Sequence, residues 1–257
     1  MPSAVAIFAH PDDIEFVAAG TMLALKERGW DLHYMNIANG SKGSSVLGPD
    51  DCAAARLAEA KVAAAAMGAA FYQPICADLE IAYTQENLKK IASVVRQSQA
   101  SIVLTHSPVD YMEDHEITCR LAVTAAFTHS MPNFESIPDY ASYSLPVTVY
   151  HAQPHGNHFP MGEAAIPHFY VDITDKISDK RNALACHVSQ KAWLDESQAM
   201  DSFLMAMEAC SREVGQWSGR FEYAEGWRKR RHTGFCGPDD DPLRAALADR
   251  IVESSDQ

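Results

Sequence analysis

The sequence predicts an α/β fold built on a mostly parallel sheet, and three observations support it. Short apolar runs of β-compatible residues alternate with longer helical segments through the first half of the chain. Glycine stands where two of these helical segments should end. The 257 residues, 47% of them hydrophobic and 21% charged, suffice for one globular domain with a substantial core. Such alternation is typical of right-handed β–α–β crossovers with helices on both faces of a doubly wound sheet.

The first half of the chain predicts four strands and four helices in strict alternation. Residues 4–9 form a continuous apolar run, the pattern of a buried parallel strand. Apolar side chains at helical spacing over residues 14–28, followed by Gly29, predict the first helix. Asp50 or Asp51 is a suitable cap for the second helix, which should stop at Gly68. The other expected elements are strands at 32–38, 71–76 and 101–106 and helices at 85–97 and 114–129.

The second half is less regular and predicts additional strands and helices at one end of the sheet. Residues 132–167 are rich in proline, histidine and tyrosine, as in loops that cover a sheet, with a strand at 147–152. Thr174 should cap a helix that carries Lys180 to Gln190. We therefore expect one Rossmann-like domain over residues 1–235 and a peripheral C-terminal tail or helix over 236–257. A strand at 169–173, a helix at 192–217 and a final polar helix after 237–242 complete the set.

Composition and charge exclude several classes of protein. A formal net charge of −13 repels a phosphate backbone, so nucleic acid is not an expected partner. The basic run from Arg228 to Arg231 is expected to be solvated or to lie at an interface. Six scattered cysteines without a CxxC pair exclude a zinc ribbon and a disulfide scaffold. No apolar window is long enough for a membrane span and residues 1–9 lack a basic leader, so we expect a cytoplasmic protein with no membrane partner.

Two clusters of histidine and carboxylate residues follow strands that should be neighbours. In the common 3-2-1-4 strand order, ligands bind outside the carboxyl ends of strands 1 and 4, where the order reverses. The segment from His10 to Asp13 follows the first of these strands, and the segment from Asp110 to His115 follows the other. Two imidazoles and a carboxylate drawn from both segments make a three-donor set that leaves room for water, as catalytic zinc sites require.

The residues of the first cluster also have a purely structural explanation. His10 can cap a helix, and Asp12 and Asp13 can complement the dipole at a helix N-terminus. The convergence of both clusters favours a metal site instead, because neighbouring carboxylates repel one another and a divalent cation removes that cost.

These motifs resemble those of the PIG-L/LmbE-like metal-dependent N-acetylglucosaminyl deacetylases, whose hallmark is an Ala-His-Pro-Asp-Asp opening and a later Asp-His. The resemblance covers roughly the first 190 residues and includes the glycine-rich loop 39–45, Arg56 with Glu59, and the segment from Val171 to Gln190. A weaker similarity lies at residues 223–227. The resemblance implies a zinc-dependent hydrolase of linear amide bonds, acting on a small N-acylated sugar or sugar conjugate. It also implies a homo-oligomer, either a trimer or a hexamer.

The same resemblance implies roles for individual residues. His10, Asp13 and His115 correspond to the metal ligands, for which Zn²⁺ is expected and Fe²⁺ or Mn²⁺ are the alternatives that such donors allow. Asp12 corresponds to the general base that takes a proton from the attacking water. Asp114 is expected to orient His115. Arg56 and Asp78 correspond to positions that contact the sugar or its substituent.

Met112 departs from the family pattern, in which many members carry histidine at this position. The family's imidazole stabilises the oxyanion or protonates the departing amine, and a thioether does neither. Tyr111 and a histidine of the 151–158 segment are the replacement donors that the sequence offers. Those histidines are His151, His155 and His158.

Two other functions compete with amide hydrolysis. A dinucleotide-binding protein would need a GxGxxG turn after the first strand, whereas the segment after Ala9 carries carboxylates that repel pyrophosphate. A non-catalytic metal-binding protein of the same fold agrees with Met112. Asp12, which metal binding does not require, favours an enzyme.

Overall fold

Eight strands of the described residues, 1–190 and 202–255, form one sheet in the computed structural model. Their order is β3-β2-β1-β4-β5-β7-β6-β8, so the predicted 3-2-1-4 arrangement is present. Strands β1 to β5 run parallel, whereas β6, β7 and β8 pair antiparallel with their neighbours. This mostly parallel sheet confirms the predicted fold class. The strands are β1 Ser3–Phe8, β2 Asp31–Asn36, β3 Ala69–Tyr72, β4 Ile102–Thr105, β5 Thr148–His151, β6 Phe169–Asp172, β7 Ala224–Lys229 and β8 Ile251–Glu253.

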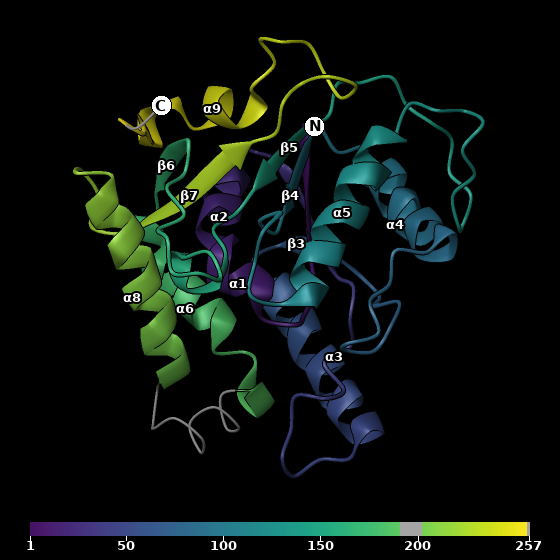
Figure 1. Ribbon diagram of the computed structural model, residues 1–257, viewed down its shortest axis with the longest axis horizontal. Helices are drawn as coiled ribbons and strands as arrows, with labels where there is room; N and C mark the ends of the chain where they lie inside the picture. The colour runs from purple at the N-terminus through teal and green to yellow at the C-terminus, as the bar shows by residue number, and fades with distance from the viewer. Residues whose placement is uncertain (191–201, 256–257) are drawn as a thin grey trace.

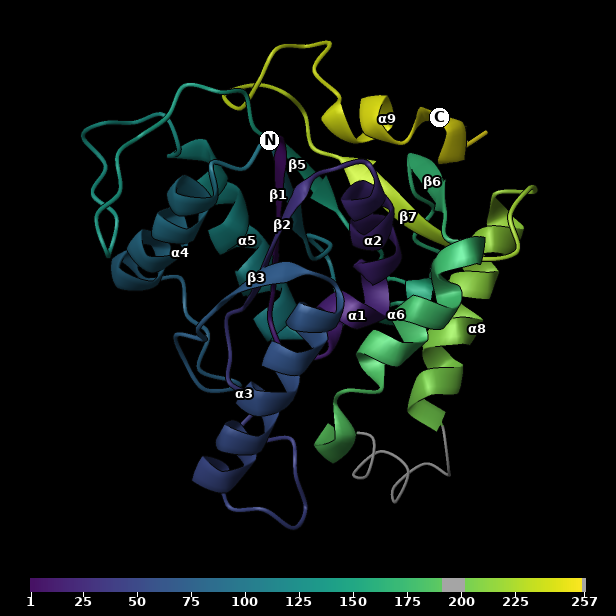
Figure 2. The ribbon, with the colours of Figure 1, turned by 180° about the vertical axis from the view of Figure 1, so that it is seen from behind.

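Helices cover both faces of this sheet (Figures 1 and 2). Helices α4 and α5 pack on one face, and α2, α3 and α6 pack on the other. Helix α8 lies beyond α6 and also contacts β7. None of the helices in the described residues is long and apolar enough to cross a membrane. The helices are α1 Asp13–Val17, α2 Ala19–Glu27, α3 Pro49–Ala66, α4 Gln85–Ser98, α5 Glu113–Phe127, α6 Ile177–Leu184, α8 Ser202–Trp217 and α9 Pro242–Ala246.

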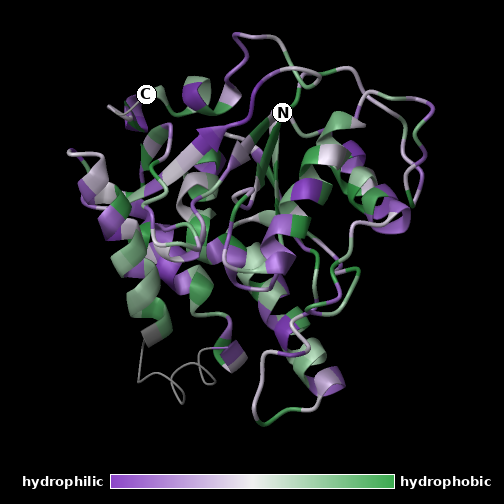
Figure 3. Cartoon of the chain, viewed as in Figure 1, coloured by the Kyte–Doolittle hydropathy of each residue, from purple (hydrophilic) through white to green (hydrophobic). Residues whose placement is uncertain are grey.

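The continuous apolar run in β1 is explained by burial on both faces. Ala4, Ala6 and Phe8 point into the core beneath α2 and α3, whereas Val5 and Ile7 point into the core beneath α4 and α5. Successive side chains of a strand alternate between faces, so a central parallel strand has no polar side. Figure 3 shows the hydrophobic colour in the central strands and both colours on the surrounding helices.

The helix expected over residues 14–28 is broken into α1 and α2 at Ala18. A distant carboxylate caps the second piece: Glu225 in β7 accepts hydrogen bonds from the backbone N–H groups of Gly20 and Thr21, at 2.9 and 2.7 Å. Lys180 donates to the same carboxylate at 2.7 Å, and both side chains are buried. Free N–H groups at a helix start need such acceptors, and this one comes from the far end of the chain.

Two expected helix starts differ from the structure. Gly48 precedes α3 as its N-cap and Pro49 occupies the first turn, so Asp50 and Asp51 lie inside the helix and not at its cap. Thr174 makes no capping bond and begins a 3₁₀ turn, Thr174–Lys176, before α6. Helix α6 then ends at Leu184, short of the expected Gln190. The helix expected over 192–217 is described from Ser202 onward, and residues 191–201 lie outside the described part.

Part of the basic run and the C-terminal segment belong to the sheet and the core, which the sequence analysis did not predict. Arg228 and Lys229 belong to β7, where Arg228 is half-buried and donates to the carbonyl of Ala165. Residues 236–257, expected to be peripheral, contribute β8 to the sheet beside β6. Leu243 and Leu247 from this segment are fully buried in the main core. Burial of these apolar side chains attaches the end of the chain to the domain.

Candidate metal centre and active site

The two histidine–carboxylate clusters meet at the carboxyl ends of β1 and β4. These strands are hydrogen-bonded neighbours, with Ile7 opposite Thr105. Strand order reverses between them, since β2 and β3 lie to one side and β5 to the other. The loop after β1 therefore faces the loop after β4 at the kind of crevice where such sheets bind ligands.

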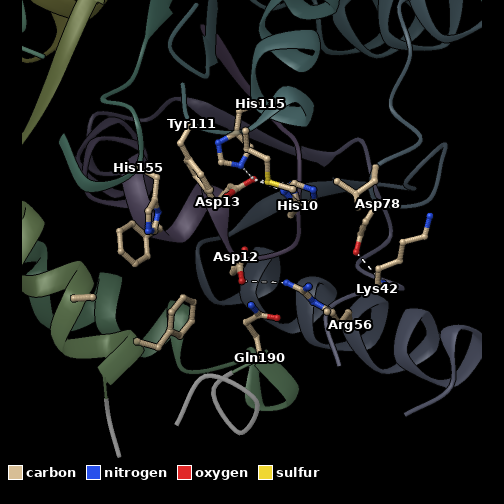
Figure 4. A pocket seen from close by; sticks show the side chains of 16 residues that line it. His10, Asp12, Asp13, Lys42, Arg56, Asp78, Tyr111, His115, His155 and Gln190 are labelled. Carbon is tan, nitrogen blue, oxygen red and sulfur yellow. Dashed lines mark hydrogen bonds and ion pairs between the residues drawn. The ribbon is translucent and has the colours of Figure 1, made fainter. Parts of the chain in front are cut away.

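Three of the predicted residues bring potential ligand atoms together. Asp13 Oδ2 lies 3.4 Å from His10 Nδ1 and 3.5 Å from His115 Nε2. The potential ligand atoms of the three residues lie within 4.8 Å of one another. Figure 4 shows these side chains gathered above Asp12. This donor set, two nitrogens and one oxygen, is the kind that holds a catalytic divalent metal.

Each of the two histidines is oriented by a different carboxylate. Asp114 Oδ2 lies 3.0 Å from His10 Nε2 and also accepts from the backbone N–H of Leu79 at 2.7 Å. Asp110 Oδ1 lies 3.1 Å from His115 Nδ1. The expectation that Asp114 orients His115 was therefore wrong about the partner. Asp110 was not among the predicted site residues, although it stands at the start of the same motif.

This arrangement fits a bound metal ion. A carboxylate on one ring nitrogen fixes the histidine tautomer and directs the other nitrogen, which here faces Asp13, toward a metal. His10 has this arrangement through its hydrogen bond with Asp114, whereas His115 has a carboxylate 3.1 Å from Nδ1 without the geometry of a hydrogen bond. The residues present therefore have the donor chemistry that Zn²⁺, Fe²⁺ or Mn²⁺ requires.

His106, which follows β4, contacts two of the three potential metal ligands. Its Nε2 accepts the backbone N–H of Ala9 at 2.9 Å and lies 3.3 Å from Asp13 Oδ2. Its ring stacks on that of His115 with centroids 4.0 Å apart. Burial lowers the pKa of His106 to about 4, so the ring is neutral. The sequence analysis counted this residue only as the end of a strand.

Asp12 lies beside the donor set without belonging to it. Its backbone has φ 110°, a conformation that residues other than glycine rarely adopt and that is often found at functional sites. Its Oδ2 accepts a hydrogen bond from Arg56 at 3.0 Å. Burial, with help from the charge of Asp13, raises the pKa of Asp12 to about 6 in spite of the nearby guanidinium of Arg56.

Arg56 and Asp78 organise the glycine-rich loop. Arg56 is buried, donates to the carbonyl of Pro11 as well as to Asp12, and lies against the loop. A Cβ atom on Gly40, whose φ is +77°, would stand 2.4 Å from Arg56 Cδ. Asp78 accepts from the backbone N–H groups of Gly40 and Lys42 at 2.7 and 3.0 Å. Glycine is thus required where this loop turns tightly around the guanidinium.

A cavity of about 390 Å³ opens over the cluster, within the range of small-molecule sites. Tyr111, Met112 and His155 line it. His151 is buried behind the cluster, with Nδ1 2.9 Å from the carbonyl of His106, and His158 bonds to the carbonyl of Gly156. The cavity thus brings in Tyr111 and His155 and leaves out His151 and His158. Lining residues that the sequence analysis did not single out are Phe16, Lys42, Gly43, Leu79, Gln190, Phe203 and Ala206.

The sequence of this region matches a known family. Residues 5–126 match PIG-L, described as GlcNAc-PI de-N-acetylase, and so include both clusters. The segment of the chain from residue 5 to residue 126 is therefore PIG-L-like. This confirms the resemblance inferred from the motifs.

PIG-L relatives with different reactions cover most of the chain. A diacetylchitobiose deacetylase from Thermococcus kodakarensis is 27% identical over 228 residues, which are 85% of this chain and 79% of the relative. A 4-oxalmesaconate hydratase from Pseudomonas putida is 28% identical over 233 residues, 87% of each chain. The solved 4-carboxy-2-hydroxymuconate hydratase from Pseudomonas putida has a TM-score of 0.71 at 25% identity and covers 89% of this chain and 96% of its own. Proteins similar to this chain therefore include both a deacetylase and a hydratase.

Proposed function

We propose that this chain is a metal-dependent hydrolase that removes an acyl group, acetyl in the first instance, from an N-acylated amino sugar or a related conjugate. The metal is Zn²⁺, or alternatively Fe²⁺ or Mn²⁺, held by His10, Asp13 and His115. The observation that carries the proposal is the place of Asp12, a buried carboxylate beside the donor set but outside it. Amide hydrolysis at a metal needs such an unligated base.

The mechanism assigns each step to a residue of the cavity. When bound, a divalent ion polarises the amide carbonyl and makes a water molecule more acidic. Asp12 accepts the proton of the attacking water while Arg56 holds its Oδ2 in place. Asp114 and Asp110 position His10 and His115.

The departing amine and the oxyanion need a donor that Met112 does not provide. His155 and Tyr111 line the cavity, and their ring centroids are 5.6 Å apart. Both side chains carry a hydrogen-bonding group, so we assign to them the hydrogen bonds to the oxyanion. The proton that Asp12 takes from the water passes from Asp12 to the departing amine. Arg56 and Asp78 shape the sugar side of the cavity through the loop that they hold.

The cellular setting is part of the same proposal. A small sugar conjugate reaches the cavity without a nucleic acid or membrane partner, and the net charge of −13 disfavours anionic partners. We place the enzyme in the cytoplasm as a homo-oligomer, a trimer or hexamer, in keeping with the family resemblance.

Metal analysis of anaerobically purified protein, combined with an amine-release screen over N-acetylated sugars, tests the function. We expect about one metal ion per chain and release of free amine from at least one substrate. Asp12→Asn serves as the matched control, because it should keep the metal and lose the activity. Protein that binds metal but releases no amine from any N-acylated substrate would contradict the proposal.

Hydration of a carbon–carbon double bond is a second candidate. The hydratase relative matches 87% of this chain at 28% identity, and Met112 removes the imidazole that amine departure uses in many family members. Addition of water also needs a metal-activated water and a base, but no leaving amine is protonated. Loss of conjugated absorbance on incubation with unsaturated di- and tricarboxylates, without amine release from N-acyl sugars, is the result that favours hydration.

A further inference from the structure

The cavity has two sides of different chemistry, which diverge from Asp12 and the metal donors. Figure 4 shows His155 and Tyr111 on one side of Asp12, and Asp78, Lys42 and Arg56 on the other. An acyl carbon that is attacked beside Asp12 has two substituents, the acyl chain and the amine. Each substituent must extend from the reacting centre along one of these two sides of the cavity.

The first side is aromatic and firmly packed. Phe16 lies against His155, with ring centroids 4.7 Å apart, and against Phe203, at 5.9 Å. Both phenylalanines are buried, and a small apolar cluster supports them from behind. Ala206 lines the same cavity from the next turn of α8. The apolar residues that pack with the two phenylalanines are Leu184, Leu204 and Met207.

The second side is more polar, although the exposed Leu79 follows Asp78 in the cavity lining. Lys42, Gly43 and Arg56 line it, and the carboxylate of Asp78 anchors the loop that carries the first two. Gln190 lies at its base with a buried Oε1 that has no hydrogen-bond partner among the described residues. An unpaired buried acceptor favours a ligand with a hydroxyl or amine donor.

We propose that the aromatic side binds an apolar N-acyl chain longer than acetyl, and that the polar side binds the hydroxylated amine part. The substrate class is therefore an N-alkanoyl or N-aroyl amino sugar. This inference rests on the proposed hydrolase function and narrows its substrate. A chain of several methylenes buries more apolar area against Phe16, Phe203 and Ala206, which line the cavity, than an acetyl methyl group does.

The reverse placement is less favourable. An alkyl chain on the polar side would remove from water the exposed ion pair that Lys42 makes with Glu80, without replacing its hydration. It would also leave Gln190 Oε1 unpaired. Sugar rings also stack on aromatic side chains. The experiment therefore measures which substituent, the acyl chain or the sugar, contacts Phe16 and Phe203 on the aromatic side.

An acyl-length series measures this directly. With the metal-loaded enzyme, kcat/KM for N-acetyl, N-butanoyl and N-hexanoyl glucosamine should rise with chain length by about fourfold per methylene, as burial of each methylene predicts. Affinities for the same three compounds, measured by calorimetry on Asp12→Asn, should rise in the same order. Binding provides a readout that does not depend on turnover.

Three variants of helix α8 test whether the acyl chain contacts the aromatic side. Ala206→Phe should fill the aromatic side, and Phe203→Ala should remove its apolar surface, so both should lower the hexanoyl-to-acetyl ratio at least tenfold. Met205→Ala is the matched control, because Met205 is on the same helix, 60% exposed and outside the cavity lining. Its ratio should equal that of the parent.

The results of these experiments distinguish a failure of the acyl-chain inference from a failure of the proposed hydrolase function. If acetyl is cleaved as fast as or faster than hexanoyl and binds at least as tightly, the inference is overturned and the hydrolase function stands. If the ratio is high but insensitive to Ala206→Phe and Phe203→Ala, the chain binds elsewhere and the inference also fails. If no amide is cleaved and chain length has no effect on binding, both proposals fail.

Discussion

Asp110 lies 3.1 Å from Nδ1 of His115 and thereby holds the imidazole that the sequence analysis had paired with Asp114. Asp110 Oδ2 has no hydrogen-bond partner among the described residues, so the contact with His115 is the main interaction of this buried side chain with another side chain. Removal of a carboxylate behind a ligating histidine typically lowers metal affinity by about 10–100-fold.

Asp110→Asn should therefore bind metal about 10–100-fold more weakly than the parent, because the amide holds the His115 ring less firmly. His115→Ala should lose metal almost completely, since three protein ligands are the minimum for such a site. Metal affinity is measured by competition with a chelator, and circular dichroism checks the fold. Equal affinities for the parent and Asp110→Asn would contradict the role of this contact.

Asp12 and Asp13 are adjacent but should respond differently to substitution. Asp12→Asn should retain metal and lose about 10²–10⁴-fold in turnover, the usual contribution of a general base. Asp13→Asn should lose metal affinity, because its Oδ2 faces both histidines. Metal content and amine release are measured on the same preparations. Full turnover in Asp12→Asn would move the base to another residue.

His155 and Tyr111 should account for the missing imidazole at Met112. His155→Ala and Tyr111→Phe should each lower kcat more than they change KM, because a donor to the transition state acts on kcat. His158→Ala is the control, since that side chain bonds to Gly156 outside the cavity lining. Met112→His should lower activity by crowding a completed site. A several-fold faster Met112→His enzyme, with His155 and Tyr111 variants unaffected, would instead indicate an incomplete site.

The buried pair of Lys180 and Glu225 should be important for stability. Lys180→Met leaves the Glu225 carboxylate buried with only the backbone N–H groups of Gly20 and Thr21, so we expect a loss of about 3–5 kcal/mol in the free energy of unfolding. Lys89→Met, which removes an exposed pair with Glu135, should cost at most about 1 kcal/mol. Urea denaturation compares the two variants. Equal losses would show that burial does not distinguish these pairs.

Asp241 should attach the C-terminal segment in a pH-dependent way. It accepts a hydrogen bond from Tyr150 at 2.6 Å and caps α9. Burial by itself would raise the pKa of Asp241, but hydrogen bonds from Tyr150 and Arg244 outweigh it and lower the pKa. A lowered folded-state pKa gives stability that is present above the unfolded pKa of about 4 and is lost as the pH falls through the folded value.

Asp241→Asn should therefore be less stable than the parent at pH 7, and the difference should shrink as the pH falls below about 4. Thermal unfolding of both proteins from pH 7 to pH 3 measures it. A stability difference that stays constant over this range would show that the charge of Asp241 is not responsible.

The sequence alone predicted the alternation of strands and helices, the position of the crevice and the two clusters that meet there. These features depend on local patterns: an apolar run such as residues 4–9 forms a buried strand in almost any α/β context, and motifs that follow adjacent parallel strands must meet at one edge. The family resemblance then implied His10, Asp13 and His115 as the metal ligands.

Tertiary structure decided the partners of the charged groups. Whether Asp114 or Asp110 orients His115 depends on side-chain directions around the start of α5, which spacing does not specify. Likewise, the break at Ala18 is stabilised by Glu225, about two hundred residues away, and His155 reaches the cavity whereas His151 does not. Hydrogen bonds and ion pairs form between whichever groups packing brings within about 3 Å, and packing is a property of the whole chain.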